Sequence, residues 1–155
     1  MSKVIVRKGP RREIRKVIKS VDVGFATTQL NRELFEADES MTLIRTIVAG
    51  QYTNDLASDR ADLAIHKSGQ GATAPSMNAP STTVGDLYAS SGDEGLNLWS
   101  HGFRGNANQD ETTIVYADVK GMRKLRKGEK IFMSGISTVA AAGAFHATVT
   151  MFFKE

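Results

Sequence analysis

The sequence contains no cysteine, so disulfide bonds, thiolate metal sites and cysteine nucleophiles are all excluded. No apolar run approaches the roughly 20 residues that a membrane-spanning helix needs, so we expect no membrane partner. The first residues are charged and no apolar stretch follows them, which is not the pattern of a secretory signal. Aromatic residues make up only 7% of the chain, too few to favour a surface that stacks many bases.

What remains is the composition of a folded protein. Hydrophobic residues make up 41% of the chain and charged residues 24%. These fractions are typical of globular proteins. A length of 155 residues is enough for one domain with a buried core.

The charge is divided unevenly along the chain. Residues 1–19 carry eight basic side chains and one acidic one, a net charge of +7, whereas the rest carries 12 basic and 16 acidic ones, a net charge of −4. We therefore divide the chain into a basic arm, residues 1–19, and a body, residues 20–155. A short polycation is suited to a polyanion, and nucleic acid is the most common one. The candidate nucleic-acid-binding residues are Lys3, Arg7, Lys8, Arg11, Arg12, Arg15, Lys16 and Lys19. A solvated tail remains the alternative.

The body is dominated by strand patterns. The clearest is 145–153, in which Phe145, Val149, Met151 and Phe153 fall on one face of an alternating stretch. Further strands are expected at 21–30, 41–49, 61–68, 96–103, 112–119 and 130–137. Residues 14–21 fit one amphipathic helix by their spacing, although an alternating pattern begins near Ser20. Seven or eight short strands favour a β-sandwich or a β-barrel.

A long stretch of small and polar residues, 69–95, interrupts the strands. A loop of this length in a compact domain tends to serve a function. Its apolar residues Met77, Leu87 and Tyr88 are candidate anchors for a contact between subunits, since such residues dominate the energetics of interfaces.

A second basic cluster lies at 120–130, where six basic side chains surround Glu129. The stretch reads as a turn between two strands, with Gly128 suited to a positive φ. It is either a solvated hairpin or a charged contact with a polyanion or a neighbouring subunit. In the second case Arg123, Lys124 and Arg126 are the candidate interface residues, and acids such as Asp110 are candidate partners.

Nothing in the sequence predicts catalysis or a cofactor. His66, His101 and His146 fall on three separate expected strands, with no spacing typical of metal ligands. The acids gather in expected turns, where they are ordinary turn residues. Calcium at a subunit contact stays open, because carboxylate oxygens suit that ion. Phosphate-binding loops and hydrolase motifs are missing from the sequence.

The C-terminal third resembles a known family. Met122-Arg123-Lys124-Leu125 is followed by Gly128-Glu129-Lys130, an apolar strand and a last strand that ends in Phe152-Phe153-Lys154. This series is similar to the capsid proteins of small circular single-stranded DNA viruses, although Glu129 stands where the family often has aspartate. The basic arm before an all-β body also resembles that family.

The resemblance implies a single eight-stranded antiparallel jelly-roll β-sandwich that assembles with itself into a closed icosahedral shell. It further implies a single-stranded DNA genome as partner, a place in the virion and passage through the host nucleus during assembly. Two other interpretations remain open. One is a β-barrel module that binds single-stranded nucleic acid, and the other is an enzyme on a β-sandwich scaffold.

Overall fold

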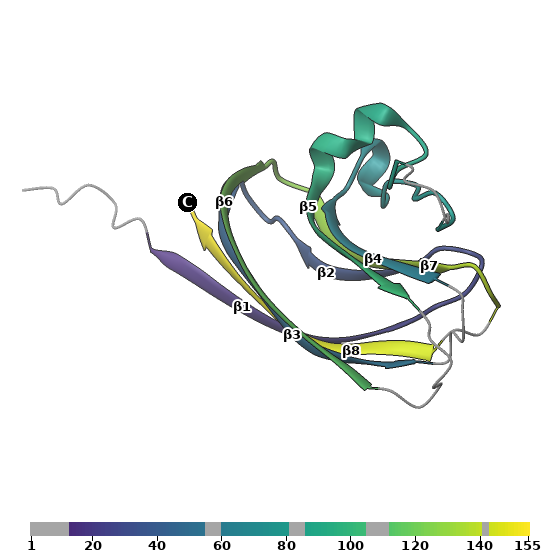
Figure 1. Ribbon diagram of the computed structural model, residues 1–155. Helices are drawn as coiled ribbons and strands as arrows, with labels where there is room; N and C mark the ends of the chain where they lie inside the picture. Colours follow the sequence, from purple (N-terminus) through teal and green to yellow (C-terminus); the bar gives the residue numbers. More distant parts are fainter. Residues whose placement is uncertain (1–12, 55–59, 81–85, 105–111, 141–142) are drawn as a thin grey trace, which may run out of the picture.

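The computed structural model describes residues 13–54, 60–80, 86–104, 112–140 and 143–155, which form eight strands and two short 3-10 helices (Figure 1). The strands are β1 (Ile14–Gly24), β2 (Leu30–Glu36), β3 (Met41–Asn54), β4 (Arg60–Lys67), β5 (Asn97–Arg104), β6 (Thr112–Leu125), β7 (Lys130–Ser137) and β8 (Gly143–Lys154). The helices are η1 (Gln70–Ala72) and η2 (Ser91–Leu96). The predicted all-β class is confirmed.

The strand order is that of a jelly roll. Strand β1 pairs with β8, β2 with β7, β3 with β6 and β4 with β5, all antiparallel, as in a long hairpin wound into a cylinder. The further pairs β3–β8 and β4–β7 join these hairpins into two four-stranded sheets. Sheet A has the order β1-β8-β3-β6 and sheet B the order β2-β7-β4-β5. The two sheets face each other in Figure 1. The predicted eight-stranded jelly-roll sandwich is thus observed.

The core fills the space between the sheets, and alternation along the strands builds it. On β8 the predicted set Phe145, Val149, Met151 and Phe153 is fully buried. At one end of the core the rings of Phe35 and Phe153 stack with centroids 4.2 Å apart. Such offset aromatic pairs add stability beyond the apolar area that they bury. As predicted, the last two strands face each other across this core, β7 from sheet B and β8 from sheet A.

The N-terminal strand begins earlier than the sequence predicts. Residues 14–21 form strand rather than helix, because β1 pairs with β8 along its whole length, from Ile14 opposite Lys154 to Gly24 opposite Ala144. The backbone hydrogen bonds of this long strand pair stabilise the strand more than a helical spacing of four apolar residues would stabilise an isolated helix. Residues 14–19 of the basic arm therefore belong to the sandwich. The expected strand at 21–30 is in fact the end of β1, a turn, and the first residue of β2.

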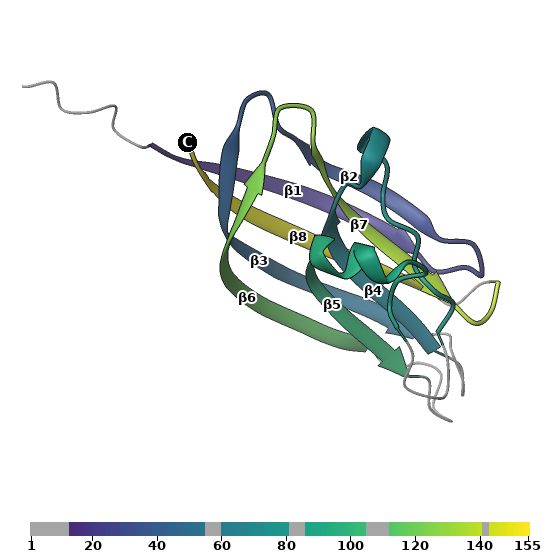
Figure 2. The same cartoon turned by 90° about the horizontal axis from the view of Figure 1, so that it is seen from above.

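The chain between β4 and β5 covers the outer face of sheet B. Its described residues include η1 and η2, which lie over that sheet in Figures 1 and 2. A small second core forms beneath, from Ala64 and Ile136 of the sheet and Met77 and Tyr88 of the covering segment. No comparable segment covers the outer face of sheet A among the described residues. The two sheets thus share one core and differ on their outer faces.

Candidate interaction surfaces

The described part of the basic arm lies on β1 at one edge of sheet A. Lys16 and Lys19 are exposed there. The Arg15 guanidinium donates to both carboxylate oxygens of Asp38 at 3.1 and 3.2 Å and lies 5.5 Å from the centroid of the Phe35 ring. The Arg15 side chain therefore packs over the Phe35 ring at one end of the core, in addition to contributing a positive charge. The other predicted contact residues, Lys3, Arg7, Lys8, Arg11 and Arg12, lie outside the described residues.

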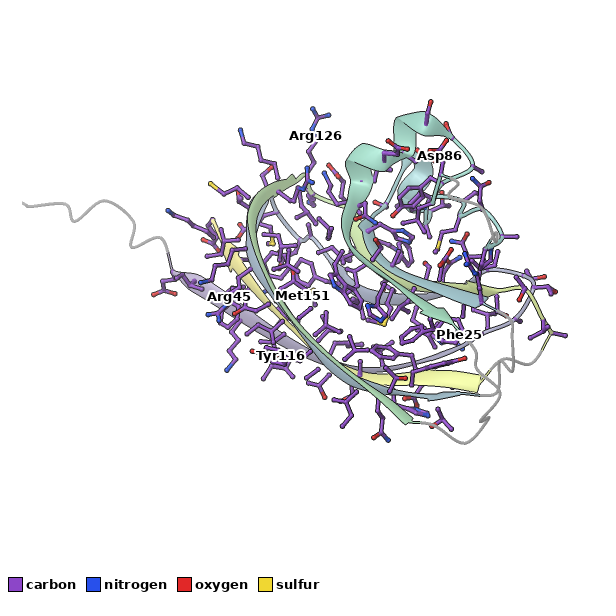
Figure 3. The ribbon with its side chains drawn as sticks, in the orientation of Figure 1. Phe25, Arg45, Asp86, Tyr116, Arg126 and Met151 are labelled. Carbon is purple, nitrogen blue, oxygen red and sulfur yellow. The ribbon has the colours of Figure 1, made fainter. Side chains whose placement is uncertain are left out.

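The basic cluster at 120–130 spans the end of β6, a turn and the first residue of β7. As predicted, it joins two strands, and Gly128 has a φ of +89°. Arg123, Lys124 and Arg126 are all exposed, and Arg126 points away from the body in Figure 3. An Arg123 Nη donates to the carbonyl of Asn97 at 3.4 Å. The structure thus keeps all three predicted interface residues accessible.

The one acidic residue of this cluster, Glu129, already has partners within the chain. Glu129 accepts a hydrogen bond from the amide of Arg126 at 3.0 Å and pairs with the ammonium group of Lys67 at 2.9 Å. Burial raises the pKa of Glu129, but the hydrogen bonds from Lys67 and Arg126 outweigh it and hold the pKa below its usual value. Glu129 is thus paired with a residue from sheet B, and among the exposed cations of the turn it attracts Arg126.

Two of the predicted interface anchors are wrong. Met77 is 6% exposed and Tyr88 2% exposed, because both pack against the chain's own sheet B. An isolated bridge joins them, and Leu87 packs at the margin of the same cluster. The apolar residues of the long loop therefore hold the loop to its own sheet, and Met77 and Tyr88 are unavailable to a neighbouring subunit.

A buried hydrogen-bond network fixes the covering segment. His66 on β4 has its Nδ1 2.9 Å from the Tyr88 hydroxyl and its Nε2 2.8 Å from the Ser134 hydroxyl. The Ser134 hydroxyl donates to the side-chain oxygen of Asn31 at 2.6 Å, and the Asn97 side-chain amide donates to the Tyr88 hydroxyl at 2.9 Å. Burial lowers the pKa of His66 to about 4, so this histidine is neutral near pH 7.

The other two histidines lie in separate places. His101 stacks near Trp99, with centroids 6.0 Å apart, and burial lowers its pKa. His146 on sheet A has its Nδ1 2.5 Å from a carboxylate oxygen of Asp22. Within the described ranges, no group of three histidine, cysteine or acidic residues is placed to hold a metal ion. The structure does not bring the three histidines together.

The outer face of sheet A carries exposed apolar side chains that the sequence analysis missed. On β1, Ile14 and Ile18 are 60% and 59% exposed. On β6, Ile114, Tyr116 and Met122 are 81%, 68% and 72% exposed. Figure 3 shows Tyr116 pointing away from the core that contains Met151. The alternation within 112–119 could have identified Ile114 and Tyr116 as outward-facing, because they lie on the opposite face of the strand from the core residue Val115.

Comparison with known proteins assigns no family. No family model matches the sequence, and no curated protein matches it. Neither helix in the described part of the chain is long and apolar enough to cross a membrane.

Some solved structures match most of this chain at low identity and with low TM-scores. One is that of Bacillus endospore appendages, described as disulfide-linked pili, with 11% identity, a TM-score of 0.35, and coverage of 91% of this chain and 88% of the other. Another is infectious bursal disease virus Gx strain, with 7% identity, a TM-score of 0.38, and coverage of 92% of this chain and 32% of the other. A third is the VP2 subviral particle of the same virus, with 10% identity, a TM-score of 0.32, and coverage of 94% and 37%.

This chain therefore spans about a third of the viral chains that it matches. At these identities and TM-scores the likenesses assign neither family nor function.

Proposed function

We propose that this chain is the subunit of a viral capsid, which assembles with itself into a closed shell and packages nucleic acid through its basic arm. One observation carries the proposal. Residues 1–19 have a net charge of +7 and continue into the first strand of a jelly roll, β1, of which they include residues 14–19, while the rest of the chain has a net charge of −4. Such a division suits an arm that contacts phosphates inside a shell and a body that does not bind nucleic acid on its outside.

The residues of the family resemblance support the same proposal. Met122-Arg123-Lys124-Leu125 ends β6, Gly128-Glu129-Lys130 forms the turn and starts β7, and Phe152-Phe153-Lys154 ends β8. These three groups of residues therefore lie at neighbouring strand ends, where the residues of a motif typical of one fold are expected to lie. We further propose a single-stranded DNA genome and a place in the virion, both of which rest on the resemblance.

The alternative β-barrel module fits the structure less well. The described strands form two open sheets rather than a closed barrel. Trp99 is half-buried and its ring is stacked on that of His101, whereas a base-stacking tryptophan would be exposed among basic side chains. We therefore keep a monomeric nucleic-acid binder only as an outcome of the test.

The test is a truncation that leaves β1 intact. Deletion of residues 1–12 leaves the whole ladder between β1 and β8, whereas deletion of residues 1–19 would remove half of β1. Size-exclusion chromatography, negative-stain microscopy and the ratio of absorbance at 260 and 280 nm would be measured for the full chain and for the 1–12 deletion.

We expect particles from both proteins, with much less nucleic acid in the truncated ones and with a content that falls as salt is raised. A full-length chain that stays monomeric under all conditions would contradict the shell. Equal nucleic-acid content in both particles would contradict the role of the arm.

A further inference from the structure

Among the described strands, two strands of sheet A lack a partner strand on one side. In the described residues β1 pairs only with β8 and β6 pairs only with β3, so they form the two edges of the sheet (Figure 2). These strands are long, at 11 and 14 residues. The unpaired N–H and C=O groups along such an edge are a template for another strand.

The exposed apolar side chains are concentrated on these two edges. All the large apolar residues that are highly exposed in the described residues lie on β1 or β6. On the outer face of the central strands, Ile47 and Phe152 are half-buried, and most of the rest is threonine or alanine. The side chain of Arg45 lies over the Phe152 ring at 5.6 Å. A partner that joins the edges would cover more apolar surface than one that lies across the middle of the face.

The partner that fits both edges at once is a second copy of this chain. Successive strands of sheet A are antiparallel, so β1 and β6 run in opposite directions. A second copy placed beside the first in the same orientation would therefore bring its β1 antiparallel to β6 of the first. We propose that β6 of one copy pairs with β1 of the next and continues sheet A from copy to copy.

Charge along the two strands selects the register. The side chains that face outward are Ile114, Tyr116, Asp118 and Lys120 on β6, and Ile14, Lys16, Ile18, Ser20 and Asp22 on β1. Side chains directly opposite each other across an antiparallel pair interact, favourably for opposite charges and unfavourably for like charges. The possible registers differ by two residues, since a shift of one would turn outward residues inward.

A register with Asp118 opposite Lys16 of the next copy satisfies this rule. It sets Tyr116 opposite Ile18, so that an opposite-charge pair lies beside an apolar pair. On the inner side, the half-buried Ala117 would face the half-buried Val17, both of which already pack against the core.

The neighbouring registers are poorer. With Asp118 opposite Ile18 of the next copy, Lys120 would face Lys16, which is a like-charge pair. A further shift in the same direction, with Asp118 opposite Ser20, would place Tyr116 against the carboxylate of Asp22. A shift in the other direction, with Asp118 opposite Ile14, would place Tyr116 against Lys16, so that no opposite charges would face each other. Complementary charge and apolar pairing therefore agree on one register.

This inference rests on the proposed self-assembly and names the surface that performs it. The contact joins two different edges, so it is heterologous, and it builds closed rings or open filaments according to its rotation. The proposed shell requires the closed form.

The absence of native cysteine allows a direct test by cross-linking. Directly opposite side chains have Cβ atoms about 5 Å apart, close enough for a disulfide after a small adjustment. The full chain would carry Lys16→Cys with Asp118→Cys. A second variant, Val17→Cys with Ala117→Cys, tests the inner side of the same register. The matched control is Ser20→Cys with Asp118→Cys.

After mild oxidation we expect a ladder of dimers, trimers and larger multimers from the two test pairs on a non-reducing gel, and little from the control. Each single-cysteine variant should stop at a small amount of dimer. A ladder only from the control pair, or from none of the three, would overturn the proposal.

A charge swap separates this proposal from the shell itself. Lys16→Glu, Asp118→Lys and the double variant would be compared, with association measured on protein free of nucleic acid. We expect about tenfold weaker association for each single variant, since a like-charge pair replaces an attractive one. Recovery in the double variant should be partial, because Asp118→Lys also removes the ion pair of Asp118 with Arg45 at 2.6 Å. Shells that form equally well in all variants would disprove the edge contact and leave the capsid function standing. Ladders from the two test pairs, together with a wild type that forms only open filaments, would support the edge contact and contradict the closed shell.

Discussion

The outer faces of the two sheets differ in how far the chain itself covers them. On sheet B, the segment between β4 and β5 buries Ala64 and Ile136 and forms hydrogen bonds with His66 and Asn97. On sheet A, the outer face has no such cover among the described residues, and isoleucine and tyrosine side chains stand exposed at its edges. An apolar surface that is covered from within stabilises the monomer, whereas one left bare can be buried only by another molecule.

The difference assigns separate roles to the two faces. Sheet B with its cover behaves as a second, smaller core, so changes there should alter the free energy of unfolding. Changes on the outer face of sheet A should leave the monomer nearly unaffected and alter association instead.

The largest expected contrast is between two tyrosines. Tyr88 is 2% exposed under the cover of sheet B, and Tyr116 is 68% exposed on sheet A. Tyr88→Ala removes a buried ring and its hydrogen bonds to His66 and Asn97, and we expect a loss of about 3–5 kcal/mol in the free energy of unfolding. Tyr116→Ala should change it by less than about 0.5 kcal/mol. Urea denaturation of unassembled protein measures both, and similar losses for the two variants would disprove the division of roles.

A smaller effect should come from pH, and it should arise on sheet B. The pKa of His66 is lowered from 6.5 to about 4 by burial. Between these values the unfolded chain binds a proton that the folded chain does not. The free energy of unfolding should therefore fall as pH drops from 6.5 toward 4, by on the order of 3 kcal/mol in total.

The same pH series on two variants isolates the source. His66→Gln should flatten the dependence between pH 6.5 and 5, leaving a weaker slope of the same sign from His101, whose pKa burial also lowers. Thr148→Ala, at an exposed position on sheet A without a titratable group, should keep the wild-type slope. If the wild-type slope persists in His66→Gln, the buried histidine is not what couples the cover to pH.

Two hydroxyl groups give a finer contrast. Ser134 is buried on the outer face of sheet B, where its hydroxyl lies 2.8 Å from His66 and donates to Asn31 at 2.6 Å. Ser134→Ala leaves both partners short of a hydrogen bond, and we expect a loss of about 1–3 kcal/mol in the free energy of unfolding. Thr148→Ala, at an exposed position on sheet A, should be neutral within about 0.5 kcal/mol. Equal melting temperatures for the two variants would show that the buried network contributes no stability.

The sequence predicted the core strands well, because their alternation is a local property. The stretch 130–137 coincides with β7, and the inward face of β8 contains each of the four residues predicted for it. In contrast, β2 was missed, since Leu30–Glu36 is short and mostly polar, and its pairing with β7 is what holds it as a strand. Long-range pairing likewise decides that residues 14–21 form strand and not helix.

The surfaces were harder to predict for the same reason. Apolar residues in a loop rich in small side chains look like interface anchors until the fold shows a sheet beneath them, as with Met77 and Tyr88. In the sequence Tyr116 looks like an ordinary strand residue and Ile18 like part of a helix face. The strand order puts them on opposite edges of one sheet. A residue's exposure depends on which strands are neighbours, and no local pattern contains that information.

The smallest effect on the fold should come from the turn where the two faces meet. There Arg123 of β6 donates to the Asn97 carbonyl of β5 at 3.4 Å, and Lys67 of β4 donates to the Lys124 carbonyl at 2.6 Å. The first contact is long and the second uses the backbone, so reversing both side-chain charges, Arg123→Glu with Lys124→Glu, should leave the unfolding transition unchanged. Assembly should nevertheless slow, because exposed charges at a rim guide association more than they stabilise it. Light scattering during assembly at two salt concentrations measures this, and the difference from wild type should shrink at high salt. If the double variant assembles at the wild-type rate in low salt, the turn is a solvated hairpin, and the contacts between copies lie elsewhere on sheet A.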